Sequence, residues 1–215
     1  WTIEPNFVLE NDKKIEAKLY EVERKKIKKL RKKNEKQAQE LKEEISSSTF
    51  SISETESKIR KNTPYPPFIT STLQLDASNK LGFSPSKTMS LAQKLYEGIN
   101  INGENKGLIT YMRTDSTNLS NQFIQEAKNI IVKNFGDNYV YNSVRTFKNK
   151  VKNSQEAHEA IRPSDPSIKP NELPSSLEQD LKKLYDLIWR RSLSTQASQS
   201  VSKIISIKVA NKSNS

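Results

Sequence analysis

The stretch "STLQLDASNKLGFSPSKTMSLAQKLYEG", Ser71 to Gly98, carries the clearest helix signals in the sequence. Ser71 begins an S-x-x-Q capping-box pattern, and Gly82 ends the first predicted helix. Ser84 followed by proline is a cap with a first-turn residue, so a second helix begins there and ends at Gly98. Two helices joined by so short a turn predict a helix-turn-helix-like pair.

The apolar residues of this pair recur at helical spacing. We expect the two buried faces to consist of Leu73, Ala77 and Leu81 in the first helix and Met89, Ala92, Leu95 and Tyr96 in the second.

Two further helices are predicted downstream. Ser120 is a cap, Leu119 and Ile124 have the spacing of a hydrophobic staple, and Gly136 ends the helix. A later helix begins at about Ser176. Its predicted buried face is Leu177, Leu181, Leu184 and Ile188.

The flanks alternate like strands. We expect strands in residues 7–10, 14–20, 49–61 and 203–210, with Ile15, Ala17 and Leu19 on a half-buried face. A helix from Asn34 interrupts them, with Ala38, Leu41 and Ile45 on one side. Prolines at 64, 66 and 67 remove backbone donors and mark a boundary.

The predicted fold class is therefore α+β, a mainly helical domain inserted into a β-rich segment. The expected domains are 1–66, a β-rich first part with one helix; 67–195, the helical domain; and 196–215, a return strand.

Composition limits the function classes. The 215 residues carry a net charge of +11, which points to a polyanionic partner, nucleic acid before an anionic membrane. There is no cysteine and a single histidine, so thiolate and histidine-rich metal sites are excluded. No apolar run is long enough to span a membrane, and no secretory signal is present. Because the chain begins with Trp1 and is only 33% hydrophobic, we expect it to be a piece of a larger protein.

The stretch "GLITYMRTDSTNLS", Gly107 to Ser120, places a phenol, a guanidinium and a carboxylate within five residues. Tyr111 can be a core residue, a stacking platform or a nucleophile. Arg113 offers a planar fork suited to phosphate, and in an extended segment it projects to the same side as Tyr111. A guanidinium favours a phenolate, which an attacking phenol needs. Alternatively, Arg113 and Asp115 pair and brace a turn.

The stretch "SQEAHEAIRPSD", Ser154 to Asp165, contains the only histidine. His158 stands four residues before Arg162, which is one face if the segment is helical. Such a face can bind a phosphate and move a proton near neutral pH. A packed core histidine is the alternative. Glu159 is a flanking carboxylate that can raise the pKa of a histidine or only solvate the segment.

A basic helix is expected from Lys25 to Lys36. It can track duplex DNA, but charge runs are more often solvated faces, and we favour that interpretation.

The two motifs together resemble bacterial DNA topoisomerase I, of the type IA DNA topoisomerase family. The segments "PPFITSTLQLDASNKLGFSPSKTMSLAQKLYEG" and "LYDLIWRRSLSTQ" add to the resemblance, which runs from about Pro67 to Gln196. It implies that Tyr111 attacks a DNA phosphodiester to give a 5′-phosphotyrosine and a free 3′-hydroxyl. It also implies that Arg113 contacts the scissile phosphate and that His158 positions DNA and takes part in proton transfer. Thr114, Asp115, Glu159 and Arg162 are carried over as further DNA-binding positions.

The resemblance implies more than this sequence contains. Family members hold Mg²⁺ in a separate Toprim domain, and no matching acidic cluster is present here. We therefore expect the chain to carry the nucleophile and part of the arch, to bind no metal itself, and to be inactive alone. The implied parent is a monomeric, ATP-independent isomerase of the cytoplasm and nucleoid that acts on single-stranded or underwound DNA. A non-catalytic DNA-binding module, with Tyr111 only stacking on a base, is the alternative.

Overall fold

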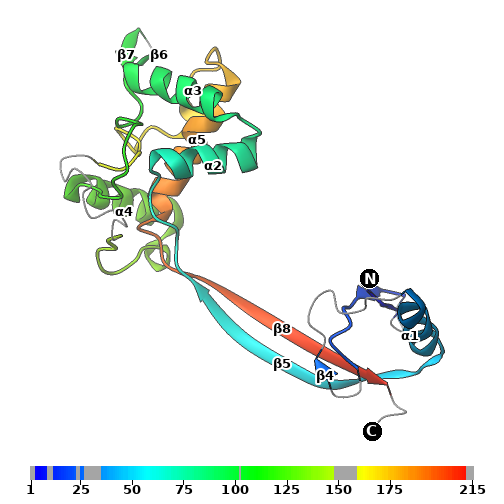
Figure 1. Ribbon diagram of the computed structural model, residues 1–215. Coiled ribbons are helices and arrows are strands. Elements are labelled where there is room, and N and C mark those ends of the chain that lie inside the picture. The colour runs from blue at the N-terminus through cyan, green and yellow to red at the C-terminus, as the bar shows by residue number, and fades with distance from the viewer. Residues whose placement is uncertain are drawn as a thin grey trace. The chain divides into compact units, whose positions relative to one another are not determined.

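The computed structural model describes residues 3–8, 12–22, 25–26, 35–101, 103–147 and 159–211 (Figure 1). Its contacts divide the chain into two units, one made of residues 1–58 with 203–215 and the other of residues 59–202. Helices and small antiparallel sheets are both present, so the predicted α+β class is confirmed. The domain boundaries expected from the sequence lie near these divisions and stay a prediction.

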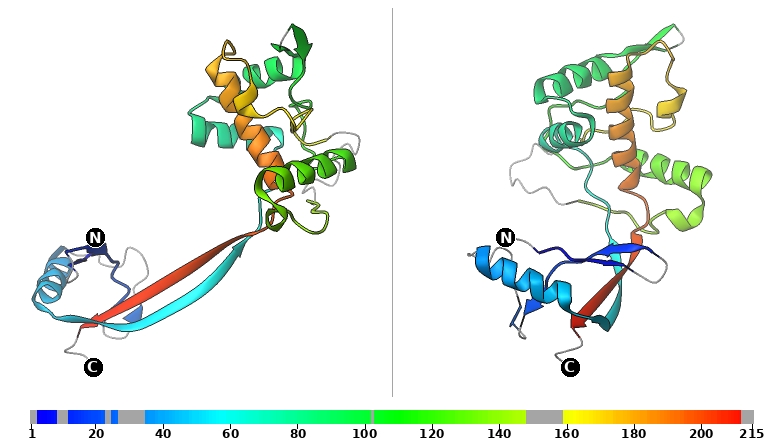
Figure 2. Two further views of the ribbon diagram at one scale, coloured as in Figure 1. Left: turned by 180° about the vertical axis from the view of Figure 1, so that it is seen from behind. Right: turned by 90° about the vertical axis from the view of Figure 1, so that its right-hand side faces the viewer.

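The unit of residues 59–202 is mainly helical. Its helices are α2 (Thr70–Leu81), α3 (Pro85–Glu97), α4 (Asn121–Phe135) and α5 (Gln179–Ser194), with single 3₁₀ turns at η1 (Asp137–Tyr139) and η2 (Pro170–Glu172). Helix α5, orange in Figure 2, runs past α2 and α3 and reaches α4, and it contacts all three. The predicted later helix is confirmed, although it begins at Gln179 and not at Ser176.

One apolar core holds α2, α3 and α5 together. Its fully buried members include Phe68, Leu73, Leu95, Leu184 and Ile188. A second, smaller cluster under α4 consists of Phe123, Ala127, Ile131 and Leu193. The two clusters together contain most of the buried apolar side chains of the described residues. The predicted inward faces of these helices are confirmed with one exception. Tyr96 of α3 is 42% exposed and lies outside the core.

The helix punctuation is mostly as predicted. Ser84 accepts a hydrogen bond from the Lys87 backbone, and Ser120 accepts one from Phe123, so both caps are confirmed. The cap expected at Ser71 is wrong. Helix α2 begins one residue earlier, and its first turn is closed by the hydroxyl of Thr72, which accepts from the backbone N–H of Ile69 at 3.0 Å. Gly82 has φ of 70°, the left-handed conformation that ends a helix.

A short hairpin joins α3 to the Tyr111 segment. Strand β6 (Ile99–Ile101) pairs antiparallel with β7 (Glu104–Lys106). Ile99 and Ile101 pack against the main core. The sequence did not predict this hairpin, because its strands have three residues each and β7 is entirely polar.

The other unit is richer in strands. Strand β1 (Asn6–Val8) pairs with β2 (Lys14–Glu16), and β3 (Glu21–Val22) pairs with β4 (Lys25–Lys26). Helix α1 (Glu35–Ser47) buries Ala38 and Leu41, as predicted. Of the half-buried face expected for Ile15, Ala17 and Leu19, the last two are partly buried as predicted, but Ile15 is exposed in the sheet of two short strands. The basic helix expected from Lys25 is also wrong at its start, where β4 lies, and residues 27–34 are outside the described chain.

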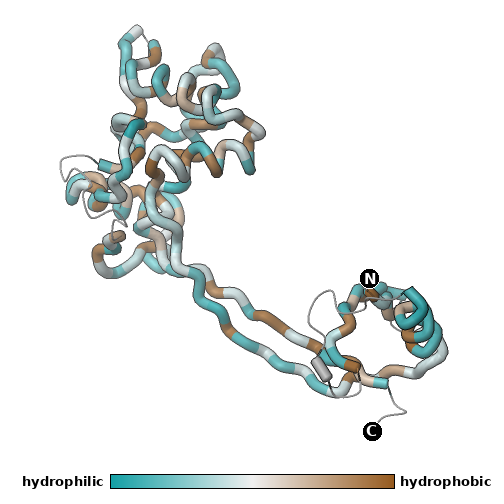
Figure 3. Tube along the Cα trace, in the orientation of Figure 1, coloured by the Kyte–Doolittle hydropathy of each residue, from teal (hydrophilic) through white to brown (hydrophobic). Residues whose placement is uncertain are grey.

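Strands β5 (Phe50–Asn62) and β8 (Ser200–Asn211) pair with each other. The boundary between the two units falls within both strands. Almost every residue of this ribbon is exposed, and Figure 3 shows hydrophobic positions along β8, where Ile204, Ile205 and Ile207 are at least 43% exposed. Among the described residues, none of the helices has the length and apolar content needed to cross a membrane.

Candidate active site

The backbone around Tyr111 is fixed from both sides although it forms no regular element. On one side, the Thr70 hydroxyl donates to the Met112 carbonyl at 2.8 Å and accepts from the Thr114 N–H at 3.0 Å. On the other side, the Thr110 N–H donates to the Arg162 carbonyl at 2.9 Å. The segment that carries the phenol is therefore held by α2 and by the segment after residue 158.

Exposure alternates along this segment. Tyr111, Arg113 and Asp115 are exposed, whereas Met112, Thr114 and Ser116 are buried. The side chains of the phenol, the guanidinium and the carboxylate thus leave the core on the solvent side, as alternation in the sequence predicts. In the described part of the chain, Arg113 and Asp115 form no ion pair with each other, which argues against the turn-bracing alternative.

The inward side chains fix the turn after the motif. The Thr114 hydroxyl accepts from the Ser116 N–H at 3.1 Å, and the Ser116 hydroxyl accepts from the Asn118 N–H at 3.1 Å. Such local side-chain to backbone bonds hold irregular chain in one conformation. The predicted DNA-binding role of Thr114 stays a prediction, and its hydroxyl is used inside the fold.

The two sequence motifs meet through their backbones. The Thr110 hydroxyl donates to the Ala160 carbonyl at 2.7 Å and accepts from the Arg162 N–H at 3.0 Å. Ile109 and Pro163 form an isolated antiparallel bridge, and the Ser164 N–H donates to the Leu108 carbonyl at 2.9 Å. Residues 159–163 are therefore paired irregular chain, and the helical alternative is excluded for them. His158 lies outside the described residues.

The side chain of Arg162 is fixed by contacts with three neighbouring residues. Its guanidinium forms an ion pair with Glu159, with Nε donating to Oε2 at 2.7 Å, and Nη1 donates to the Pro163 carbonyl at 2.8 Å. It also lies over the Phe123 ring, 4.9 Å from the centroid. Arg162 is largely buried and Glu159 partly so. This geometry favours a positioning role over direct neutralisation of a phosphate, and the DNA-binding assignment of both residues stays a prediction.

Tyr96 is a neighbour of the candidate nucleophile that the sequence did not place there. Its ring lies edge-on to the ring of Tyr111, with centroids 5.4 Å apart and an interplanar angle of 65°. A helical period assigned Tyr96 to the core, and no local signal separates it from that face.

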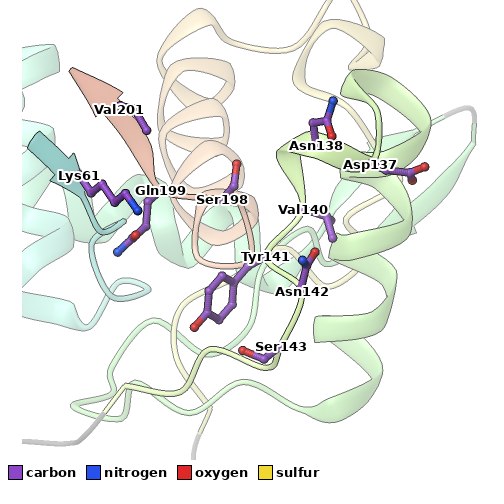
Figure 4. A pocket seen from close by; sticks show the side chains of 10 residues that line it. All are labelled: Lys61, Asp137, Asn138, Val140, Tyr141, Asn142, Ser143, Ser198, Gln199 and Val201. Carbon is purple, nitrogen blue, oxygen red and sulfur yellow. The ribbon is translucent and has the colours of Figure 1, made fainter. Parts of the chain in front are cut away.

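A hollow of about 530 Å³ lies at the start of β8, apart from these residues (Figure 4). Its lining is mixed polar and apolar and comes from Lys61, from Asp137, Asn138 and residues 140–143, and from Ser198, Gln199 and Val201. Figure 4 shows the side chains of Tyr141, Lys61 and Gln199 around it. None of the site residues expected from the sequence lines it.

Arg145 fixes the segment that carries Tyr141. It donates from Nη1 to the carbonyls of Thr195 and Ala197, at 2.8 and 2.7 Å, and its guanidinium lies 4.1 Å from the Tyr141 ring centroid. Burial lowers the pKa of Arg145, an effect that Tyr141 partly opposes. A cation is favourable where a helix ends, because carbonyls there lack helical partners. No sequence pattern predicts this contact, which spans 50 residues.

A protein-family model described as DNA topoisomerase matches residues 1–215. The chain therefore belongs to the DNA topoisomerase family, which confirms the resemblance found in the sequence.

Two bacterial proteins show the similarity to curated relatives. The DNA topoisomerase 1 of Rickettsia bellii is 45% identical over 210 residues, which cover 98% of this chain and 26% of the relative. The DNA topoisomerase 1 of Campylobacter jejuni is 45% identical over 199 residues, or 93% of this chain and 28% of the relative. This chain thus spans about a quarter of the length of the curated relatives it matches.

A solved structure shares the fold. Full-length topoisomerase I from Thermotoga maritima superposes with a TM-score of 0.71 and 38% identity, covering 93% of this chain and 30% of the other. Fold and sequence therefore agree on the family.

Proposed function

We propose that this chain supplies the nucleophile of a type IA DNA topoisomerase, and that the nucleophile is Tyr111. The observation that carries the proposal is the exposed phenol on a segment anchored on both sides, with an exposed guanidinium two residues on. Membership of the DNA topoisomerase family supports it.

The proposed reaction is a transesterification. The Tyr111 oxygen forms a bond to phosphorus, the bond from phosphorus to the 3′-oxygen breaks, and that oxygen takes a proton and leaves as a 3′-hydroxyl. One phosphodiester replaces another of similar energy, so no nucleotide is hydrolysed. Another strand passes while the broken end stays linked, and reversal reseals the DNA.

Arg113 has the role of holding the scissile phosphate. Its fork can donate two hydrogen bonds to phosphoryl oxygens and stabilise the charge that develops on them. Arg113 is exposed two residues after Tyr111, which suits both the binding of the phosphate and the stabilisation of its charge. His158, carried over from the resemblance, is proposed to position DNA and to move the proton.

Magnesium is part of the proposal only for the full-length parent. The described residues contain no group of three or more carboxylate, histidine or cysteine side chains that could hold a metal ion. These residues therefore do not fit a metal site, and every step above uses side chains of this chain. We accordingly propose that the 215 residues alone do not relax DNA.

The proposed substrate is single-stranded or underwound DNA, bound by a monomeric cytoplasmic protein at the nucleoid. The net charge of +11 supports a polyanionic partner. Affinity should fall steeply as salt is raised, because each phosphate contact releases a counterion. A flat salt dependence would argue against this partner.

The test uses the full-length parent and end-labelled single-stranded DNA, with denaturing gels that show the covalent adduct. Tyr111→Phe removes one exposed oxygen, so the protein should fold normally and form no adduct. Arg113→Lys should also impair cleavage, because a point charge cannot reproduce the planar fork. An adduct that persists in Tyr111→Phe would disprove the assignment. A wild-type protein that binds DNA without any adduct would favour the non-catalytic module.

A further inference from the structure

Tyr96 and Tyr111 form an aromatic pair on the exposed side of the candidate active site. Both residues are 42% exposed, and their ring centroids are 5.4 Å apart at an interplanar angle of 65°. That arrangement places a ring edge against a ring face, which is a favourable geometry for aromatic side chains. Tyr96 is therefore an exposed residue whose ring contacts the ring of Tyr111.

The main chain under the two rings is tightly connected. The Leu108 N–H donates to the Leu95 carbonyl at 2.7 Å, which joins the last turn of α3 to the chain that leads to Tyr111. Gly107 allows this approach, because a Cβ at that position would lie 2.7 Å from the carbonyl oxygen of Tyr96. The two backbones are thus docked to each other, and the Tyr96 ring has a fixed base from which to contact its neighbour.

The backbone of Tyr111 is already held by hydrogen bonds, but these bonds do not restrict the orientation of its side chain. The hydrogen bonds from Thr70 and to Arg162 hold the main chain on either side of it, but they do not act on rotation about its side-chain bonds. A half-exposed tyrosine can populate several rotamers. Attack on phosphorus requires the oxygen in line with the leaving group, so rotamers that point elsewhere are unproductive.

We propose that the ring of Tyr96 is a positioning residue that selects the productive rotamer of Tyr111. This inference rests on the proposed function of Tyr111. Tyr96 touches neither DNA nor the reacting atoms in this role. The contact is between rings, so the ring of Tyr96 acts and its hydroxyl does not.

The experiment measures single-turnover cleavage of a labelled oligonucleotide by excess full-length parent protein. Aromatic pairs of this kind correspond to a rotamer preference of about 2- to 10-fold. Tyr96→Leu should therefore lower the cleavage rate about 2- to 10-fold, and Tyr96→Phe should keep the wild-type rate. DNA affinity, measured in a Tyr111→Phe background where no cleavage intervenes, should be the same with Tyr96 or leucine at position 96.

The matched control is Tyr139→Leu. It removes another exposed tyrosine ring of the same unit, one that faces Phe135 with centroids 6.3 Å apart. This variant should cleave at the wild-type rate.

Each contrary outcome rejects the inference in a different way. An unchanged rate in Tyr96→Leu means that the ring does not position Tyr111. An equal loss in Tyr96→Phe means that the hydroxyl acts, and weaker DNA binding by the leucine variant means that Tyr96 stacks on a base. The proposed function fails separately, if Tyr111→Phe still forms the adduct. Because Tyr96→Phe keeps the ring and removes only the hydroxyl, a loss of cleavage rate in this variant rejects the inference even if Tyr96→Leu unfolds.

Discussion

The two units of this chain differ in how their side chains are buried. In residues 59–202 the helices pack around two apolar clusters, and the irregular segments that carry the candidate site are joined to these helices by hydrogen bonds. In the other unit, the buried apolar side chains of the described residues are Ala38 and Leu41 of α1, and strands β5 and β8 are exposed along almost their whole length. The difference teaches that an exposed candidate site residue such as Tyr111 can be presented precisely only from a well-packed base.

The largest expected effect comes from the main core. Leu184→Ala removes a fully buried side chain of α5 and leaves a cavity, which should destabilise the chain by about 2–5 kcal/mol. Ile205→Ala, in exposed β8, is the matched control and should change stability by less than about 0.5 kcal/mol. Urea unfolding followed by helical circular dichroism measures both. Similar shifts in the two variants would remove the contrast between the units.

A smaller effect is expected at Arg145. Arg145→Met keeps much of the volume but leaves the buried carbonyls of Thr195 and Ala197 without this donor, at a cost of about 1–3 kcal/mol. Hydrogen exchange should show lost protection at Tyr141, whose N–H donates to the Gln196 carbonyl. Arg190→Met, which removes an exposed arginine from α5, should leave this protection unchanged.

The smallest effect concerns acid stability. Asp76 of α2 is paired with Arg191 of α5 and with Lys80. Burial raises the pKa of Asp76, but the hydrogen bonds and charges of Lys80 and Arg191 outweigh it, so the net pKa lies below the ordinary 3.8. The folded state therefore gains stability above the unfolded pKa and loses it as pH falls from 3.8 through the lower folded value.

Asp76→Asn should remove this part of the acid dependence. The measurement is the urea midpoint of wild type and variant between neutral pH and the acid range. The two should differ at neutral pH and converge below the folded pKa. A constant gap at every pH would show that Asp76 acts through packing and not through its charge.

The sequence predicts local structure well and long-range contacts poorly. Ser84, Ser120 and Gly82 were placed correctly because a cap depends only on its own turn. The cap predicted at Ser71 is wrong because α2 already begins at Thr70, with Ile69 as its cap. Thr70 is hydrogen-bonded to Met112 and Thr114, 42 and 44 residues away, which no local pattern shows. The buried face predicted for α3 is wrong at Tyr96, which is 42% exposed and contacts Tyr111 outside its own helix.

The same limit applies to the candidate site. The alternation of Tyr111, Arg113 and Asp115 follows from neighbouring residues, so their shared exposure could be expected. The contact of Thr110 with Ala160 and Arg162 could not, since 50 and 52 residues separate them. Arg145 was missed for the same reason, and the position of His158 stays a prediction.

The pairing of Asn62 with Ser200 has a consequence for how such a chain can fold. Asn62 Nδ2 lies 3.5 Å from Ser200 Oγ, although 138 residues separate them. Holding the ends of an unfolded loop of that length together costs about 3 kcal/mol more entropy than closing a short turn. Once residues 59–202 fold, their two ends are already adjacent, and β5 and β8 can pair as though a tight hairpin joined them. Folding of the helical unit thus lowers the loop-closure entropy that β5 and β8 would otherwise lose on pairing.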